Sequence, residues 1–154
     1  MAGFNVELPN DLIKQFEQLG NNSEKMIGEM TRAGAEKVKS NVQSKVPLSE
    51  MANHVKLTRT YKTPSDDGIK TQIYFEGYLP FSKTNRKYFS RRNKSDGKLY
   101  RTEKGVPISF LAIMYEYGRS TKPFPTKPFF RKSFKKSEIE AEMLKVQQKY
   151  LPKE

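Results

Sequence analysis

Few residues in this chain could carry out acid–base, nucleophilic or metal chemistry. His54 is the only histidine among 154 residues and cysteine is absent, which excludes disulfides and thiolate catalysis and leaves structural zinc without its usual ligands. A lone histidine is more often a surface or packing residue than a catalyst. The adjacent carboxylates Asp66 and Asp67 stand in a Pro-Ser-Asp-Asp-Gly turn sequence, which accounts for them without catalysis. We therefore expect no enzymatic activity, no cofactor and no metal.

Glu116 is the acid with the most unusual surroundings, because it lies inside the apolar run 108–118. A buried carboxylate must be paired or hydrogen-bonded, and Arg119 or a basic residue of a neighbouring subunit would serve. No second acid or base is near it in sequence, so a structural role is favoured over a catalytic one.

The net charge of +12 is concentrated in two segments. Residues 79–107 hold nine basic and two acidic residues, residues 119–136 hold seven basic and no acidic ones, and the rest of the chain sums to −2. Such a field attracts polyanions or acidic protein surfaces, although solvated loops are the plainer interpretation. The residues that we expect to contact a partner or DNA are Lys83, Arg86, Lys87, Arg91, Arg92, Lys94, Arg101, Arg119, Lys122 and Lys127.

The aromatic residues gather in the same part of the chain. Fourteen of the 18 Phe and Tyr residues fall in residues 74–134, which is more ring surface than a small sheet easily buries. Tyr, Phe and Arg together are favoured at protein interfaces and also suit stacking on unpaired bases. We infer that other subunits or partners cover part of this surface.

The N-terminal third is predicted to be helical. The apolar spacing predicts a short helix over residues 10–20 that Gly20 ends, and a long helix over residues 23–46 that Pro47 ends. Small residues around Gly34 in the long helix would allow another element to approach closely.

Period-two alternation then predicts strands. Residues 54–62 and 69–78 alternate between apolar and polar side chains, which indicates a β-hairpin with its turn at residues 64–68. The period is lost over residues 79–107, which we predict to be a long basic arm with its own hairpin around residues 95–97.

Two elements are predicted near the C-terminus. The apolar run is predicted to be a short helix that Ser109 caps and Gly118 closes, with a buried strand as the alternative. Pro128 is predicted to begin a last helix over residues 128–151.

These elements predict a single α+β domain over residues 1–154. In it, a long N-terminal helix and a C-terminal helix pack on a small antiparallel β-sheet, and the basic arm is inserted. No apolar run approaches the roughly 18 residues of a membrane span, so we expect no membrane association.

The apolar run and the start of the predicted last helix resemble a family signature. The sequence Ala-Ile-Met-Tyr-Glu-Tyr-Gly over residues 112–118, followed by Lys-Pro-Phe-Phe-Arg over residues 127–131, resembles the signature of the tail-completion, or head–tail joining, minor structural proteins of tailed bacteriophages. Arg119 stands where that family commonly has a small hydroxyl residue, and the basic arm is longer than is usual there. The residues that carry the resemblance are Ala112, Tyr115, Glu116, Tyr117, Gly118, Pro128, Phe129 and Phe130.

The resemblance implies a structural virion protein of the phage neck, made in the host bacterial cytoplasm. It implies a homo-oligomeric ring, a hexamer by family analogy, between the head connector and the tail. The implied partners are the head connector and the tail terminator or tail tube proteins, and DNA in the channel is a further candidate.

The resemblance also suggests roles for individual residues. Gly118 would allow a sharp turn, and Glu116 would accept backbone N–H groups or pair with a cation. Pro128 would begin the last helix, while Phe129 and Phe130 would hold that helix against the sheet.

Two other function classes remain open from the residues alone. A non-specific nucleic-acid-binding protein would account for the basic segments and the interleaved rings. A small basic nuclease or ribosome-dependent toxin fits the size and charge, but it lacks a credible acid–base set.

Overall fold

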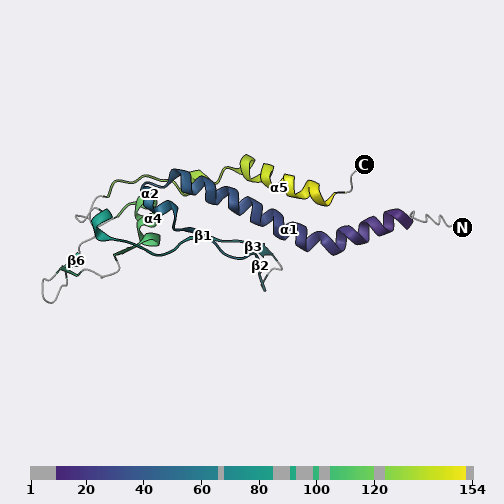
Figure 1. Ribbon diagram of the computed structural model, residues 1–154, viewed down its shortest axis with the longest axis horizontal. Coiled ribbons are helices and arrows are strands. Elements are labelled where there is room, and N and C mark those ends of the chain that lie inside the picture. Colours follow the sequence, from purple (N-terminus) through teal and green to yellow (C-terminus); the bar gives the residue numbers. More distant parts are fainter. Residues whose placement is uncertain are drawn as a thin grey trace, which may run out of the picture.

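The computed structural model describes residues 10–65, 68–84, 91–92, 99–100, 105–119 and 124–151. The helix α1 (Asn10–Lys45) is the longest element. The last helix, α5 (Lys136–Tyr150), runs antiparallel along one side of α1, and strands lie along the other side (Figure 1). The short helices α2 (Ser49–Ala52) and α4 (Ile108–Tyr117) lie at the end of the molecule opposite the N-terminus. The α+β class expected from the sequence is confirmed.

The N-terminal helix is continuous, so the expected break at Gly20 is wrong. A glycine inside a helix costs about 1 kcal/mol but does not prevent the helix from continuing. The Ser23 hydroxyl donates to the Gly20 carbonyl at 2.8 Å, a bond within the continuous helix. The other end is as expected: α1 stops at Lys45, two residues before Pro47.

The C-terminal half of α1 carries its buried face. Val38 and Val42 are buried, whereas Ile27 is 45% exposed, so the apolar stripe is covered only over part of its length. A Cβ atom at Gly34 would lie 3.1 Å from Ile139 Cγ2, which is tighter than ordinary contact. The close approach predicted around Gly34 is therefore confirmed, and α5 is the approaching element.

The described strands form four two-stranded antiparallel pairs instead of the single sheet expected. Thr58 and Gln72 show where the first hairpin is interrupted, because the Gln72 N–H donates to Thr58 Oγ1 at 2.8 Å, a side-chain acceptor in place of the backbone carbonyl. The pairs are β1 (Val55–Leu57) with β4 (Ile73–Phe75), β2 (Tyr61–Lys62) with β3 (Ile69–Lys70), β5 (Tyr78–Leu79) with β8 (Val106–Pro107), and β6 (Arg91–Arg92) with β7 (Leu99–Tyr100).

The predicted turn of this hairpin is confirmed. The Thr63 N–H donates to the Gly68 carbonyl at 2.7 Å, and residues 66–67 lie outside the described part of the chain.

The predicted arm is shorter than residues 79–107. Leu79 and Val106 are partners in the β5–β8 pair and both are buried, so the two ends of the segment belong to the core. The η1 turn (Phe81–Lys83) follows β5. The β6–β7 pair agrees with a hairpin in the arm, while its predicted turn at residues 95–97 lies outside the described residues.

The prediction of a short helix over the apolar run is confirmed by α4, but its predicted cap is wrong. Pro107, with φ −57° and ψ 130°, occupies the N-cap position, and Ser109 lies inside the helix. Gly118 follows the last helical residue as predicted.

Pro128 does not begin the last helix. Residues 124–129 have no regular structure, η2 (Arg131–Ser133) is a single 3-10 turn, and α5 begins only at Lys136. Phe134 has φ −85° and ψ 80° and Lys135 is extended, so helical geometry is interrupted between the two elements.

The core lies where α1, α2, α4 and the β1–β4 and β5–β8 pairs meet. No helix in the described ranges is both long and apolar enough to cross a bilayer. The buried residues that form the core cluster are Val38, Val42, Met51, Val55, Leu79, Val106, Ile108, Leu111, Ala112 and Phe129.

Candidate functional site

The Glu116 carboxylate joins α4 to the chain that leads into α5. It is only 4% exposed. Its Oε2 accepts the N–H groups of Phe129 at 2.9 Å and Phe130 at 3.0 Å. Its Oε1 accepts the Arg131 N–H at 3.3 Å and the Arg131 Nε–H at 2.7 Å. The predicted acceptance of backbone N–H groups is confirmed, but the cation is Arg131 and not Arg119.

The surroundings of Glu116 favour its charged form. Burial alone would raise the pKa of this carboxyl, but hydrogen bonds from the Arg131 guanidinium and three backbone N–H groups outweigh burial and lower its pKa below the ordinary value. The same pairing raises the pKa of Arg131. Glu116 is therefore an ionised structural anchor, which is unsuited to act as a general acid.

A second set of bonds holds the chain after α4 against the helix. Gly118 has φ +81° and its N–H donates to the Met114 carbonyl at 2.8 Å, a backbone conformation that suits glycine. The Lys127 N–H donates to the Tyr115 carbonyl at 2.9 Å, and the ring of Phe124 meets that of Tyr115 edge-on at 5.0 Å. Burial raises the pKa of the Tyr115 hydroxyl. The predicted sharp turn at Gly118 thus brings residues 124–131 back along α4.

Phenylalanine rings connect this segment to the strands. The ring of Phe75 in β4 lies 6.0 Å from Phe129 and 6.1 Å from Phe130, and Phe130 lies 5.3 Å from Phe134. The Ser133 hydroxyl donates to the Phe129 carbonyl at 2.7 Å and is fully buried. The predicted contact of Phe129 and Phe130 with a strand is confirmed, although it precedes η2 and does not lie on the last helix. Pro128 is half-buried beside them.

The opposite face of α4 carries large apolar side chains toward solvent. Phe110 is 41% exposed, Ile113 56% and Tyr117 68%, and the spacing of three and four residues places them on one face. The Arg131 guanidinium lies over the Tyr117 ring at 5.1 Å, a cation–π contact. We call Phe110, Ile113 and Tyr117 the α4 stripe.

Comparisons with protein-family models, curated proteins and solved structures find no match. The site is therefore interpreted from its own geometry. Within the described residues, no three His, Asp or Glu side chains are grouped so that they could hold a metal ion.

The structure separates the predicted partner-contacting residues. Lys83 in η1 lies 3.5 Å from the Glu50 carboxylate. Lys127 is exposed and Arg119 half-buried, both near the C-terminal end of α4. Arg91 and Arg92 form β6. Arg86, Lys87, Lys94, Arg101 and Lys122 lie outside the described residues.

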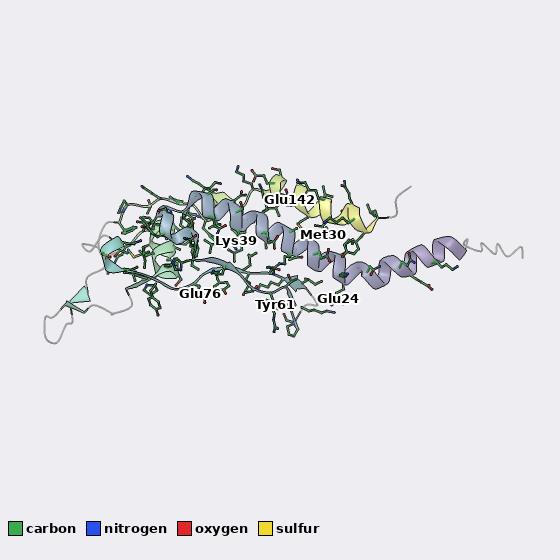
Figure 2. The ribbon with its side chains drawn as sticks, in the orientation of Figure 1. Glu24, Met30, Lys39, Tyr61, Glu76 and Glu142 are labelled. Atoms are coloured by element: carbon green, nitrogen blue, oxygen red, sulfur yellow. The ribbon has the colours of Figure 1, made fainter. Side chains whose placement is uncertain are left out.

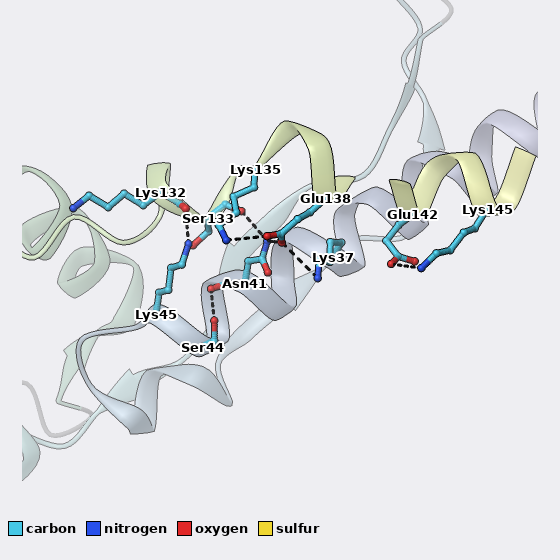
Figure 3. Close-up of polar contacts among 10 residues, drawn as sticks. All are labelled: Lys37, Asn41, Ser44, Lys45, Lys132, Ser133, Lys135, Glu138, Glu142 and Lys145. Atoms are coloured by element: carbon cyan, nitrogen blue, oxygen red, sulfur yellow. Dashed lines mark hydrogen bonds and ion pairs between the residues drawn. The ribbon is translucent and has the colours of Figure 1, made fainter. Parts of the chain in front are cut away.

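A polar cluster fixes the position of α5 on α1 (Figure 3). The Asn41 amide donates to the Ser133 carbonyl at 3.2 Å and to the Glu138 carboxylate at 3.0 Å. Lys135 at 2.8 Å and Lys37 at 3.5 Å pair with the same carboxylate. Hydrogen bonds from Lys135 and Asn41 lower the pKa of Glu138 to about 2.

The α4 stripe and the role of Arg131 were not predicted from the sequence. Once the helix is known, the spacing of Phe110, Ile113 and Tyr117 identifies an outward face opposite to Ile108, Leu111 and Ala112. The pairing of Arg131 with Glu116 has no comparable local signal, because the two residues are 15 positions apart.

Proposed function

We infer that this chain is a structural protein of the tailed-phage neck, acting in tail completion or head–tail joining as a subunit of a ring in the virion. Its role in this proposal is recognition and sealing between the head connector and the tail. The chain binds no substrate in this role.

The observation that carries the proposal is the bonding of Glu116 to residues 129–131. The two parts of the sequence that resemble the family are separated by about ten residues, and the Glu116 carboxylate accepts three backbone N–H groups from the second part. These hydrogen bonds give residues 112–118 and 127–131 one structural role, which explains why the two segments would occur together in a family signature. The exposed α4 stripe beside them supports a role in assembly, because exposed apolar surface of this kind is typical of interaction sites.

Electron microscopy and DNA binding together test the proposal. Purified protein should form closed rings in negative stain, and it should bind random duplex and single strands only weakly near physiological salt. Monomers at every concentration, combined with tight DNA binding that weakens steeply with salt, would contradict it.

Non-specific nucleic-acid binding is the second candidate, and the β6–β7 pair favours it. This pair contains Arg91 and Arg92 opposite Tyr100 and Leu99, and Figure 1 shows β6 at the end of the molecule away from both termini. A basic two-stranded ribbon suits the phosphate backbone. Arg91→Ala with Arg92→Ala should then reduce the slope of affinity against salt, and an unchanged slope would count against this function.

A further inference from the structure

The first turns of α1 extend beyond the rest of the described chain. The Lys62 ammonium lies 3.9 Å from the Glu24 carboxylate, and Tyr150 hydrogen-bonds Glu29. Figure 2 shows Glu24 close to the hairpin that Tyr61 marks, and Figure 1 shows the turns before it projecting past both α5 and the β2–β3 pair. We call residues 10–23 the overhang, which is about 21 Å long at 1.5 Å per residue.

The sequence of the overhang is typical of an amphipathic helix that packs against another protein surface. Leu12, Ile13, Phe16 and Leu19 occur at helical spacing, and an isolated helix of this length is marginal in water. Ile27, one turn after the overhang, is 45% exposed. The apolar pattern of the sequence therefore continues from Ile27 into the overhang, whose backbone projects beyond the other described elements in Figure 1.

The α4 stripe is a matching surface at the other end of the molecule. Its helix has ten residues, or about 15 Å, so the overhang can lie along its full length. Lys127 and Arg131 are exposed at the C-terminal end of this stripe.

The charges of the two ends are opposite. The overhang holds two acidic residues and one basic residue, whereas residues 119–136, which follow the α4 stripe, hold seven basic and no acidic ones. Complementary charge steers association and fixes which surfaces meet.

We propose that the overhang of one copy binds the α4 stripe of the next copy. The two surfaces lie at opposite ends of the molecule, so the contact is head-to-tail. An open assembly of bound copies therefore keeps a free overhang at one end and a free α4 stripe at the other. Such a contact repeats until it closes into a ring or extends as a filament. The inference rests on the proposed ring function and names the surfaces that build the ring.

The absence of cysteine allows a direct test by disulfide crosslinking. Gln18→Cys places a thiol on an exposed position of the overhang, and Ile113→Cys places one in the α4 stripe. The double variant should crosslink into a ladder of dimers, trimers and larger species under mild oxidation. A mixture of the two single variants should give a single dimer band, while each single variant alone should stay monomeric on a denaturing gel.

A matched control separates contact from chance collision. Ser40 is exposed on α1 but lies outside the overhang, so Ser40→Cys combined with Ile113→Cys should give no ladder. A homodimer of Ile113→Cys alone would overturn the proposal, because it requires two α4 stripes to face each other. Rings seen in the microscope without any crosslink between positions 18 and 113 would also overturn it, but would leave the ring function standing.

A second variant measures the strength of the contact. Ile113→Asp replaces an exposed side chain, so folding should be unaffected, while self-association should weaken by about tenfold or more. Wild-type protein that stays monomeric at every concentration, together with a double cysteine variant that gives no crosslinks, would contradict this interface and the ring function together. Unchanged association of Ile113→Asp would contradict the interface alone.

Discussion

The Glu116 carboxylate and the Arg131 residue form one connected unit, in which a single side chain accepts both the backbone N–H and the guanidinium of its partner. Glu116 is buried, whereas the Arg131 side chain is 62% exposed. The backbone half of this contact is therefore shielded from water and the guanidinium half is not. Stability should depend on the carboxylate much more than on the arginine side chain.

Replacement of Glu116 tests this asymmetry. Glu116→Ala leaves the buried N–H of Phe129 and the partly buried N–H groups of Phe130 and Arg131 without an acceptor. We expect it to lower the free energy of unfolding by about 2–4 kcal/mol. Glu116→Gln keeps one acceptor oxygen and should lose less. Arg131→Ala should cost about 1 kcal/mol or less, because its ion pair is largely solvated. Urea denaturation of the three variants measures their free energies of unfolding. An equal loss of stability in Arg131→Ala and Glu116→Ala would contradict the expected order.

Acid should weaken the attachment of α5 through Glu138. The pKa of this carboxyl is about 2 in the folded chain against an ordinary value of 4.5, so the folded state binds its proton less readily than the unfolded state. Its contribution to stability is complete above pH 4.5 and is lost as the pH falls from there to about 2. Glu138→Gln should flatten this part of the curve of thermal midpoint against pH. Glu140→Gln, which removes only an exposed pair with Lys136, is the control and should leave the curve unchanged.

Gly118 should not tolerate a side chain. Its φ of +81° disfavours other residues, and a Cβ atom there would lie 3.0 Å from Thr126 Cγ2. Gly118→Val should lower the free energy of unfolding by about 1–3 kcal/mol. Gly20→Ala is the matched control, because a Cβ atom there meets nothing within 4 Å, and it should stabilise α1 by up to about 1 kcal/mol. A thermal midpoint of Gly118→Val equal to that of the wild type would show that the turn does not need glycine.

Gly34 sets the distance between α1 and α5. Its Cβ would lie 3.1 Å from Ile139 and 3.3 Å from Met143, so Gly34→Leu must separate the two helices. We expect a loss of about 1–3 kcal/mol from overpacking, measured by thermal unfolding. Gly28→Ala on the same helix meets only Thr60 at 3.9 Å and should be neutral or stabilising.

Residues between β5 and β8 should be removable without loss of the fold. Leu79 and Val106 are antiparallel partners, so a short glycine–serine linker in place of residues 85–104 can rejoin the chain. We expect the thermal midpoint to stay near that of the wild type and assembly, measured by mass photometry, to weaken. An unfolded variant would show that the replaced residues contribute to the core.

The sequence alone determined the α+β class, most of the element types and several boundaries. Apolar spacing indicated helical structure in α1 and α5, whereas for α4 it left a buried strand as the alternative. Pro47 and Gly118 marked the ends of α1 and α4, and residues 64–68 marked the hairpin turn, because each acts through its own backbone geometry. The close approach at Gly34 was predictable for the same reason, since only a missing side chain permits it.

Tertiary structure decided what local signals could not. Pro128 begins no α-helix, because the single 3-10 turn after it is followed by non-helical backbone at Phe134 and Lys135. The choice of Arg131 over Arg119 as the partner of that carboxylate depends on how the chain returns along α4. The exposure of the α4 stripe likewise depends on which helix face the core covers, because burial is set by the packing of distant segments and not by local spacing.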